Sequence, residues 1–203
     1  TILQTVFAVL LIGSAGLAKA GHHEDALNIE QLSQAFGWDL EGAEIQSQKV
    51  ADGLYILFGI GGNIAVSIGE DGVLIVDDQL PQVMDKIEAA IAQIGGGKID
   101  YAINTHWHFD HAEGNNVLGP KGTTIVAHSN ARADMQQGGI VNMVVAKYNQ
   151  QPYPKEALPV FTYDEGMQIH FNEGEIDLRN FSSAHTNGDT VVIFKAQNAV
   201  HMG

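Results

Sequence analysis

The sequence predicts mixed layers of helices and strands, of the α+β or α/β class, with two sheets and outer helices. The chain has 203 residues, of which 45% are hydrophobic, enough for one domain with a sizeable core. Short β-rich runs are separated by glycine-containing turns, and helical spacing interrupts them only in places. We expect this domain to cover residues 49–203, after a polar lead-in at residues 21–48 with a short helix near residues 29–36.

The first half of the domain begins with three strands. The runs LYILFG, NIAVSIG and GVLIVDD occupy residues 54–59, 63–69 and 72–78. Glycine-rich turns join them, which predicts an antiparallel meander.

A helix is expected next, over residues 82–94. Its apolar positions recur at helical spacing, and it begins after Pro81 and ends before three consecutive glycines. Another strand, residues 99–104, leads directly into the segment THWHFDH.

The rest of the chain alternates in a similar way. We expect a strand at residues 123–127 and a helix at residues 129–136 capped by Ser129 or Asn130. Residues 138–160 carry three of the five prolines and are predicted to form a mobile connection. Four more strands are expected, at residues 167–171, 175–181, 190–195 and 198–202.

The N-terminus is typical of a targeting segment. The apolar run VFAVLLI precedes Ala18-Lys19-Ala20, an A-x-A cleavage pattern, so residues 1–20 are interpreted as a partial signal peptide. The run is too short to span a bilayer, and the alternative is a buried helix of the domain. Because an initiator Met and a basic region are absent, we expect the sequence to begin inside the signal peptide. A mature chain starting near Gly21 would be periplasmic or secreted, with no membrane attachment after cleavage.

Charge and cysteine content limit the partners. The formal net charge is −14, which argues against nucleic acid or an anionic membrane surface as the main partner. An anionic small substrate stays possible, since a bound metal can reverse the local field. The chain has no cysteine, so any metal must take histidine and carboxylate ligands.

THWHFDH, residues 105–111, is the strongest chemical signal. In an extended stretch His106 and His108 point the same way and can reach one metal. After a bend, Asp110 and His111 can reach a second point nearby. Such a set suits zinc, and also iron or manganese. The trailing residues 114–116 predict a tight loop rather than an amphipathic helix.

Other histidines differ in their prospects. His185 lies in a polar loop between two predicted strands, where a distant ligand is expected. His128 ends a strand and is expected to be structural, His170 is a strand residue, and His201 stays undecided. The adjacent histidines at positions 22 and 23 are expected to be solvated.

THWHFDH resembles the H-x-H-x-D-H signature of the metallo-β-lactamase superfamily. Three further segments resemble its motifs in order: VLIVDD at 73–78, AHTNGDTVV at 184–192 and VHMG at 200–203. The resemblance covers residues 50–203 and implies an αβ/βα sandwich with the site at one edge between the two sheets. The aspartate and histidine that follow VHMG in the family would come after Gly203, so the C-terminal part of the fold and half of the second metal site are expected to be missing.

The resemblance also implies roles for individual residues. The first metal would be held by His106, His108 and His185, and the second by Asp110 and His111. Asp110 would also be catalytic, orienting the nucleophile and passing a proton.

Two further aspartates would support the metal loops. Asp77 would be an acceptor behind them, with a plain turn aspartate as the alternative. Asp189 would assist His185, with a turn or cap role equally open.

The implied function is that of an exported zinc-dependent hydrolase with one or two Zn²⁺ ions and a small-molecule substrate. A metal-bound hydroxide would attack an ester, lactone, thioester or amide-like bond. His108 stands where oxygen-reducing members of the family usually have Glu, which favours zinc hydrolysis. The alternatives are a true β-lactamase, whose commonest pattern uses a cysteine that this chain lacks, and a metal-binding fragment or protein without catalytic activity.

Overall fold

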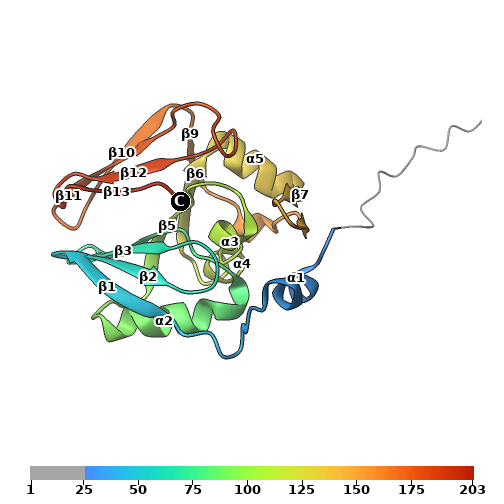
Figure 1. Ribbon diagram of the computed structural model, residues 1–203. Helices are drawn as coiled ribbons and strands as arrows, with labels where there is room; N and C mark the ends of the chain where they lie inside the picture. The colour runs from blue at the N-terminus through green and yellow to red at the C-terminus, as the bar shows by residue number, and fades with distance from the viewer. Residues whose placement is uncertain (1–25) are drawn as a thin grey trace, which may run out of the picture.

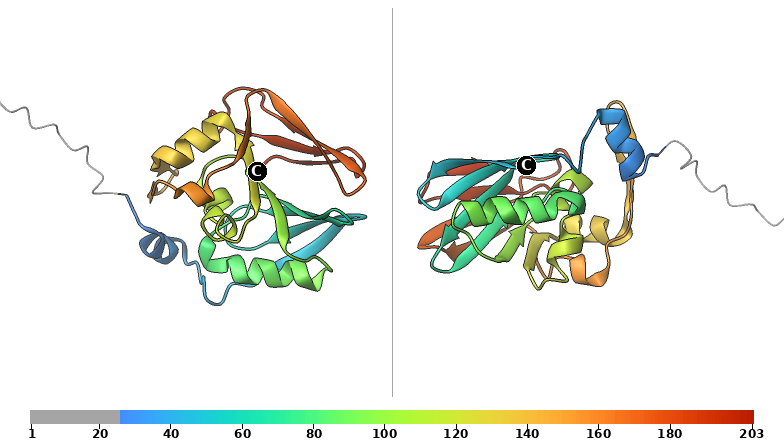
Figure 2. Two further views of the ribbon diagram at one scale, coloured as in Figure 1. Left: turned by 180° about the vertical axis from the view of Figure 1, so that it is seen from behind. Right: turned by 90° about the horizontal axis from the view of Figure 1, so that it is seen from below.

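The computed structural model describes residues 26–203. Two β-sheets face each other, and a helix covers the outer face of the larger one (Figure 1, Figure 2). This confirms the predicted layering of two sheets and outer helices. The predicted signal peptide and the two N-terminal histidines lie outside the described residues. Among the described residues, no helix has both the length and the apolar character needed to cross a bilayer.

The larger sheet has seven strands in the order β1-β2-β3-β4-β5-β6-β9. The predicted meander is confirmed, because β2 (Leu54–Phe58), β3 (Ile64–Gly69) and β4 (Gly72–Val76) pair antiparallel. The next three strands, β5 (Ile99–Ile103), β6 (Thr124–His128) and β9 (Phe161–Tyr163), extend the sheet in parallel. A polar edge strand, β1 (Gln46–Ala51), was not predicted; most of its side chains are exposed, so it carries no alternating apolar pattern.

The smaller sheet is an antiparallel meander of four strands. It consists of β10 (Gly166–Phe171), β11 (Gly174–Arg179), β12 (Val191–Phe194) and β13 (Ala199–His201). Its inner face packs against the larger sheet, with Leu178 and Val192 among the fully buried residues and Leu74 and Ile103 opposite them. This apolar layer holds the two sheets at a fixed relative position, which the candidate site requires.

Helix α2 (Met84–Gln93) covers the other face of the larger sheet (Figure 1). A 3₁₀ turn at Pro81–Val83 leads into it. Its residues Met84, Ile87 and Ile91 are fully buried, as the predicted apolar spacing requires. Helix α1 (Ile29–Phe36) also lies where it was predicted, and Asn28 and Gln31 close its start as a capping box.

Three local predictions were wrong. Residues 138–160 were expected to be a mobile connection, but they contain the hairpin β7 (Gly139–Asn142) and β8 (Lys147–Gln150) and a 3₁₀ turn at Lys155–Ala157. Helix α5 (Ser129–Gln137) is capped by His128, whose ring accepts a hydrogen bond from the Asn130 amide. The expected tight loop at 114–116 is instead the start of α4 (Asn115–Leu118), a helical turn that follows α3 (Phe109–Ala112).

Candidate metal centre

The histidine cluster lies where β4 and β5 end. These strands are parallel neighbours, so the segments that follow Val76 and Ile103 leave the sheet at the same edge. The first contributes Asp77, and the second runs into residues 105–111. The loop between β11 and β12 brings His185 to the same place from the smaller sheet. The site therefore lies between the two sheets.

His106, His108 and His185 form one group. One ring nitrogen from each lies within 4.8 Å of the others. The Nε2 atom of His185 is 2.9 Å from Nδ1 of His108, and Nε2 of His106 is buried without a hydrogen-bond partner. A buried polar atom without a partner is costly, and three converging imidazoles are a common zinc ligand set. The residues present therefore fit a metal ion.

The protonation states of His106 and His108 also favour binding of a metal ion. Burial, followed by repulsion from His111 and other neighbours, lowers the pKa of His106 to about 3. Burial and the neighbouring His185 lower the pKa of His108 to about 4. Both rings are therefore neutral at pH 7 and have lone pairs for a cation.

The backbone path differs from the predicted one. Residues 105–107 form a bend, so His106 and His108 do not belong to one extended stretch. His108 itself is extended, with φ −64° and ψ 147°, and starts α3 as its N-cap. The two rings meet at 4.8 Å between centroids because of this bend, rather than through strand alternation.

Asp77 supports residues 105–111 from the interior of the protein. Its carboxylate is fully buried and accepts hydrogen bonds from the Thr105 amide (2.7 Å) and the Thr105 hydroxyl (2.8 Å). It also lies 2.7 Å from Nδ1 of His111. Burial alone would raise the pKa of Asp77, but the hydrogen bond and charge of His111 hold it below its ordinary value. Burial would lower the pKa of His111, but Asp77 and Asp110 raise it to about 9.

Asp110 and His111 form the second predicted pair. The Oδ2 atom of Asp110 lies 3.6 Å from Nε2 of His111, on the side of the ring away from Asp77. The two side chains therefore lie next to each other, and a second metal ion held by them stays a prediction. Burial raises the pKa of Asp110, although the neighbouring His111 partly opposes this.

Asp189 orders the loop that carries His185. Its carboxylate accepts the amide of His185 at 2.6 Å and the hydroxyl of Thr186 at 2.6 Å. Burial would raise the pKa of Asp189, but the hydrogen bonds from Thr186 and from the His185 amide lower it. Asp189 thus caps the turn and, through the same hydrogen bonds, fixes the backbone of His185, a candidate ligand. The cap role and the supporting role that the sequence left open are therefore compatible.

Sequence reasoning missed Thr105 and Thr186. The Thr105 hydroxyl lies between Asp77 and Nδ1 of His106, at 2.8 and 3.0 Å. It can therefore relay the orientation of the carboxylate to a candidate ligand. Each threonine is adjacent in the sequence to a predicted ligand, but nothing in the local sequence indicates that its hydroxyl contacts an aspartate carboxylate.

Three further histidines, His128, His170 and His201, lie outside this group. His128 binds the carbonyl of Asp164 at 2.7 Å and caps α5, which agrees with its expected structural role. His170 is exposed on β10. His201 is buried on β13, with Nε2 3.2 Å from the carbonyl of Asn63.

A cavity of about 300 Å³ opens at the histidines. It is lined by Thr105, His106, His111, His185, Asp189, Met202 and Gly203.

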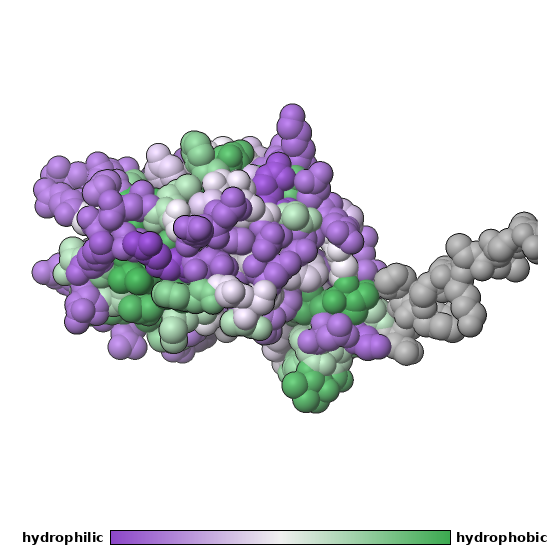
Figure 3. Space-filling view, turned by 90° about the horizontal axis from the view of Figure 1, so that it is seen from above, coloured by the Kyte–Doolittle hydropathy of each residue, from purple (hydrophilic) through white to green (hydrophobic). Residues whose placement is uncertain are grey.

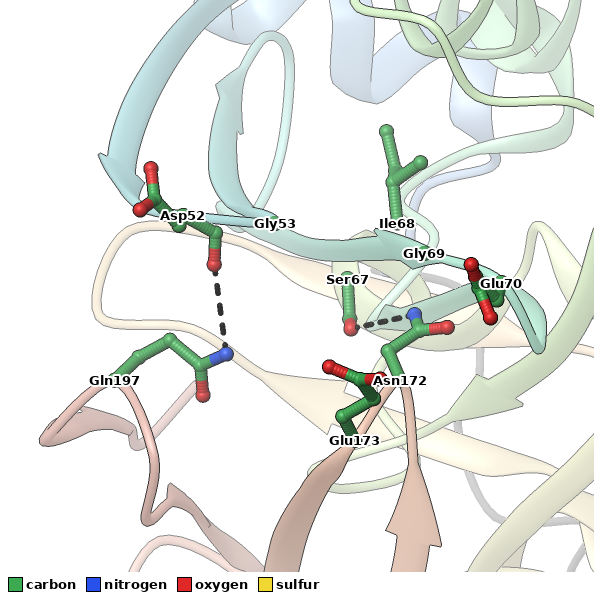
Figure 4. A pocket seen from close by; sticks show the side chains of 9 residues that line it. All are labelled: Asp52, Gly53, Ser67, Ile68, Gly69, Glu70, Asn172, Glu173 and Gln197. Carbon is green, nitrogen blue, oxygen red and sulfur yellow. Dashed lines mark hydrogen bonds between the residues drawn. The ribbon is translucent and has the colours of Figure 1, made fainter.

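A separate polar hollow lies at the other end of β4, between turns of the two sheets (Figure 4). There Asn172 donates to the Ser67 hydroxyl at 3.0 Å and so ties the sheets together. The surface seen from above is mostly hydrophilic, in keeping with the acidic composition (Figure 3).

Comparison with known proteins identifies the family. The model of the metallo-β-lactamase superfamily matches residues 59–203. The chain belongs to the metallo-β-lactamase superfamily. Two histidines of the H-x-H-x-D-H signature, His106 and His108, form the group with His185 at the edge of the sheet. No curated protein matches the chain.

Solved structures of this superfamily share the fold. A metallo-β-lactamase of Cronobacter sakazakii is 19% identical, with a TM-score of 0.65 over 77% of this chain and 61% of that one. The subclass B3 metallo-β-lactamase BJP-1 of Bradyrhizobium japonicum is 19% identical, with a TM-score of 0.61 over 75% and 57%. FEZ-1 of Legionella gormanii is 17% identical, with a TM-score of 0.60 over 74% and 58%. The chain thus spans about three fifths of the length of these structures.

Proposed function

We propose that the protein is an exported, zinc-dependent hydrolase that cleaves an ester, lactone, thioester or amide-like bond in a small molecule. Two observations carry the proposal: His106, His108 and His185 each offer a ring nitrogen within 4.8 Å of the others, and Nε2 of His106 is buried without a hydrogen-bond partner. Membership in the metallo-β-lactamase superfamily supports it.

His106, His108 and His185 would hold the first ion. Asp110 and His111 would contribute to a second. When bound, zinc supplies Lewis acidity, which polarises a substrate carbonyl and lowers the pKa of water. Because Asp77 occupies Nδ1 of His111, the Nε2 atom of that ring is left to face the cavity.

Asp110 is the candidate for proton handling. Its side chain is 32% exposed, so it can contact solvent water, while partial burial raises its pKa. A carboxylate with a raised pKa is a stronger base than a solvated one, and it would orient water and accept its proton. The same group could then return that proton to the leaving atom.

Hydrolysis of β-lactams is the second candidate. The solved structures that share this fold are described as metallo-β-lactamases, several of subclass B3. Sequence identities of 17–21% support the fold only, so an experiment must decide which bond the protein cleaves.

The test is a substrate panel on the zinc-loaded protein, comprising nitrocefin, a lactone, an ester and a thioester, with Asp110→Asn as the matched control. We expect turnover of a lactone, ester or thioester that falls at least about 100-fold in the control. Cleavage of nitrocefin alone would replace the first candidate by the second. One zinc per chain without any turnover would support a metal-binding protein that is not an enzyme.

Export is tested separately, by expressing the protein from its native gene in a bacterial host and sequencing the N-terminus of the protein recovered from the periplasm and medium. A mature chain starting near Gly21 is expected. Recovery of only the uncleaved chain in the cytosol would contradict export.

A further inference from the structure

Gln79 is fully buried two residues after Asp77, and its backbone adopts φ +55°. This left-handed conformation is unfavourable for a residue with a side chain and persists only where the surroundings hold it. The side chain is held: its Nε2 donates to the carbonyl of Gly62 at 2.6 Å. Gln79 therefore connects the metal side of the larger sheet with the turn between β2 and β3.

That turn, residues 59–63, is called the glycine loop below. It packs directly on the second pair of candidate ligands. The Gly62 amide donates to the carbonyl of Asp110 at 2.9 Å, and a Cβ atom on Gly62 would overlap the ring of His111. A Cβ atom on Gly61 would lie 2.7 Å from the same Asp110 carbonyl. No side chain fits between the glycine loop and these ligands.

The backbone at residues 78 and 79 is hydrogen-bonded to the turn that carries these ligands. The amide of Asp78 donates to the carbonyl of His111 at 2.8 Å, and the carbonyl of Gln79 accepts the amide of Gly114 at 3.0 Å. The turn that carries Asp110 and His111 is thus hydrogen-bonded both to residues 78–79 and to the glycine loop. The side chain of Gln79 joins these two segments through its hydrogen bond to Gly62.

We propose that Gln79 is a positioning residue for Asp110 and His111, acting through the glycine loop. The proposal rests on the proposed function in one respect, namely that these two side chains bind a metal ion. Without the Gln79 bond the glycine loop would move away from the ring of His111, and the pair would lose its fixed geometry. Groups that orient ligands in this way typically change metal affinity by about 10- to 100-fold.

The chain offers a matched control in Gln150. It is 1% exposed, and its Nε2 donates to a backbone carbonyl, that of Trp107, at 2.6 Å. Trp107 lies between His106 and His108, so this second buried glutamine braces the other ligand set. In both glutamines the Oε1 atom is buried without a partner. Replacing either by Met keeps the length of the side chain and removes only its hydrogen bonding.

The experiment compares Gln79→Met and Gln150→Met with the unmodified chain by two readouts. The first is hydrogen exchange of the Gly62 amide in the metal-free protein, followed by NMR. The second is zinc affinity, measured by competition with a chelator and resolved into a tighter and a weaker site. In Gln79→Met we expect Gly62 exchange at least about 10-fold faster and the weaker site about 10- to 100-fold weaker, with the tighter site unchanged. In Gln150→Met we expect normal Gly62 exchange and loss at the tighter site.

Unchanged Gly62 exchange in a folded Gln79→Met variant overturns the proposal, as do equal losses at both zinc sites in both variants. If the unmodified chain takes up one zinc only, the dinuclear part of the proposed function fails, and Gly62 exchange alone decides the role of Gln79. If Gln79→Met does not fold, Gly62→Ala replaces it, because it keeps Gln79 and pushes on His111 from the same loop. Loss of the weaker site with an unchanged tighter site then supports the proposal, and no loss contradicts it.

Discussion

His185 brings its Nε2 to within 2.9 Å of Nδ1 of His108, although the two residues are 77 positions apart. His108 follows a strand of the larger sheet, and His185 lies in a loop of the smaller sheet. The candidate metal site therefore exists only when the two sheets are packed on each other. Metal binding and the packing of the sandwich should consequently stabilise one another.

Removing His185 tests this link. Its ring is exposed, so His185→Ala should leave the metal-free fold intact while weakening zinc binding at the tighter site at least about 100-fold. Chelator competition measures the affinity, and a thermal melt with and without zinc measures the linked stability. His170→Ala, an exposed histidine on β10, is the control and should bind zinc normally. Equal affinities in the two variants would remove His185 from the site.

The Asp77–His111 pair predicts how the metal-free protein responds to pH. The folded pKa of His111, about 9, lies above its ordinary value of 6.5, so the stabilisation is complete below pH 6.5 and is lost as the pH rises through 9. The full loss is on the order of 3 kcal/mol. The pKa of Asp77 is lowered, so its own contribution is lost only as the pH falls below its ordinary range. Urea unfolding of the metal-free chain from pH 5 to 10 measures this profile.

Asp77→Asn checks the cause of that profile. Asparagine tolerates the φ of +64° found at this position but has no charge for His111. The variant should be less stable than the unmodified chain at pH 6 by about 2–4 kcal/mol and should lose most of the slope between pH 6.5 and 9. A slope that persists unchanged would assign the titration to another group.

Glu113 predicts a second pH effect in a different window. It is 8% exposed and accepts the Tyr148 hydroxyl at 2.8 Å, and burial raises its pKa from 4.5 to about 7. The folded state therefore binds the proton more tightly, and stability falls as the pH rises from 4.5 through 7. Glu113→Gln, which stays neutral, should be more stable than the unmodified chain at pH 8 by about 1–3 kcal/mol. Urea unfolding at pH 4.5 and pH 8 decides, and a variant that is less stable at pH 8 would refute the expectation.

Asp189 should matter through the loop it caps. Asp189→Asn weakens the acceptor for the amides of His185 and Thr186, so the ring of His185 becomes less well placed. Zinc affinity at the tighter site should fall about 10-fold. Asp164→Asn removes an exposed carboxylate outside the site and is the control. Equal affinity in both variants would leave Asp189 a turn residue only.

Much of the fold could be predicted from local patterns. The meander of β2, β3 and β4 and the helix α2 have strong apolar periodicity bounded by glycine and proline, so their types and order were predicted. Strand β1 could not be, because an edge strand exposed along most of its length shows no alternation. The β7–β8 hairpin was hidden by the prolines that follow it, although Tyr148 anchors it in the core.

The residues of the candidate site could be predicted from the sequence, but the backbone path that brings them together could not. The dense ligands of THWHFDH and the isolated polar setting of His185 identified the side chains that the fold brings together. The bend at residues 105–107 depends on Asp77 accepting the Thr105 amide, a contact between distant segments that no local pattern records. The same holds for Gln79, whose importance comes from its contact with Gly62 across the sheet edge.

The central claim, that His106, His108 and His185 hold one zinc ion, is tested most directly by zinc X-ray absorption on the chain loaded with one equivalent of zinc. Three imidazole nitrogens at about 2.0–2.1 Å are expected. His185→Ala should show two. A zinc bound by at most one imidazole, or a chain that retains no zinc at one equivalent, would contradict the account.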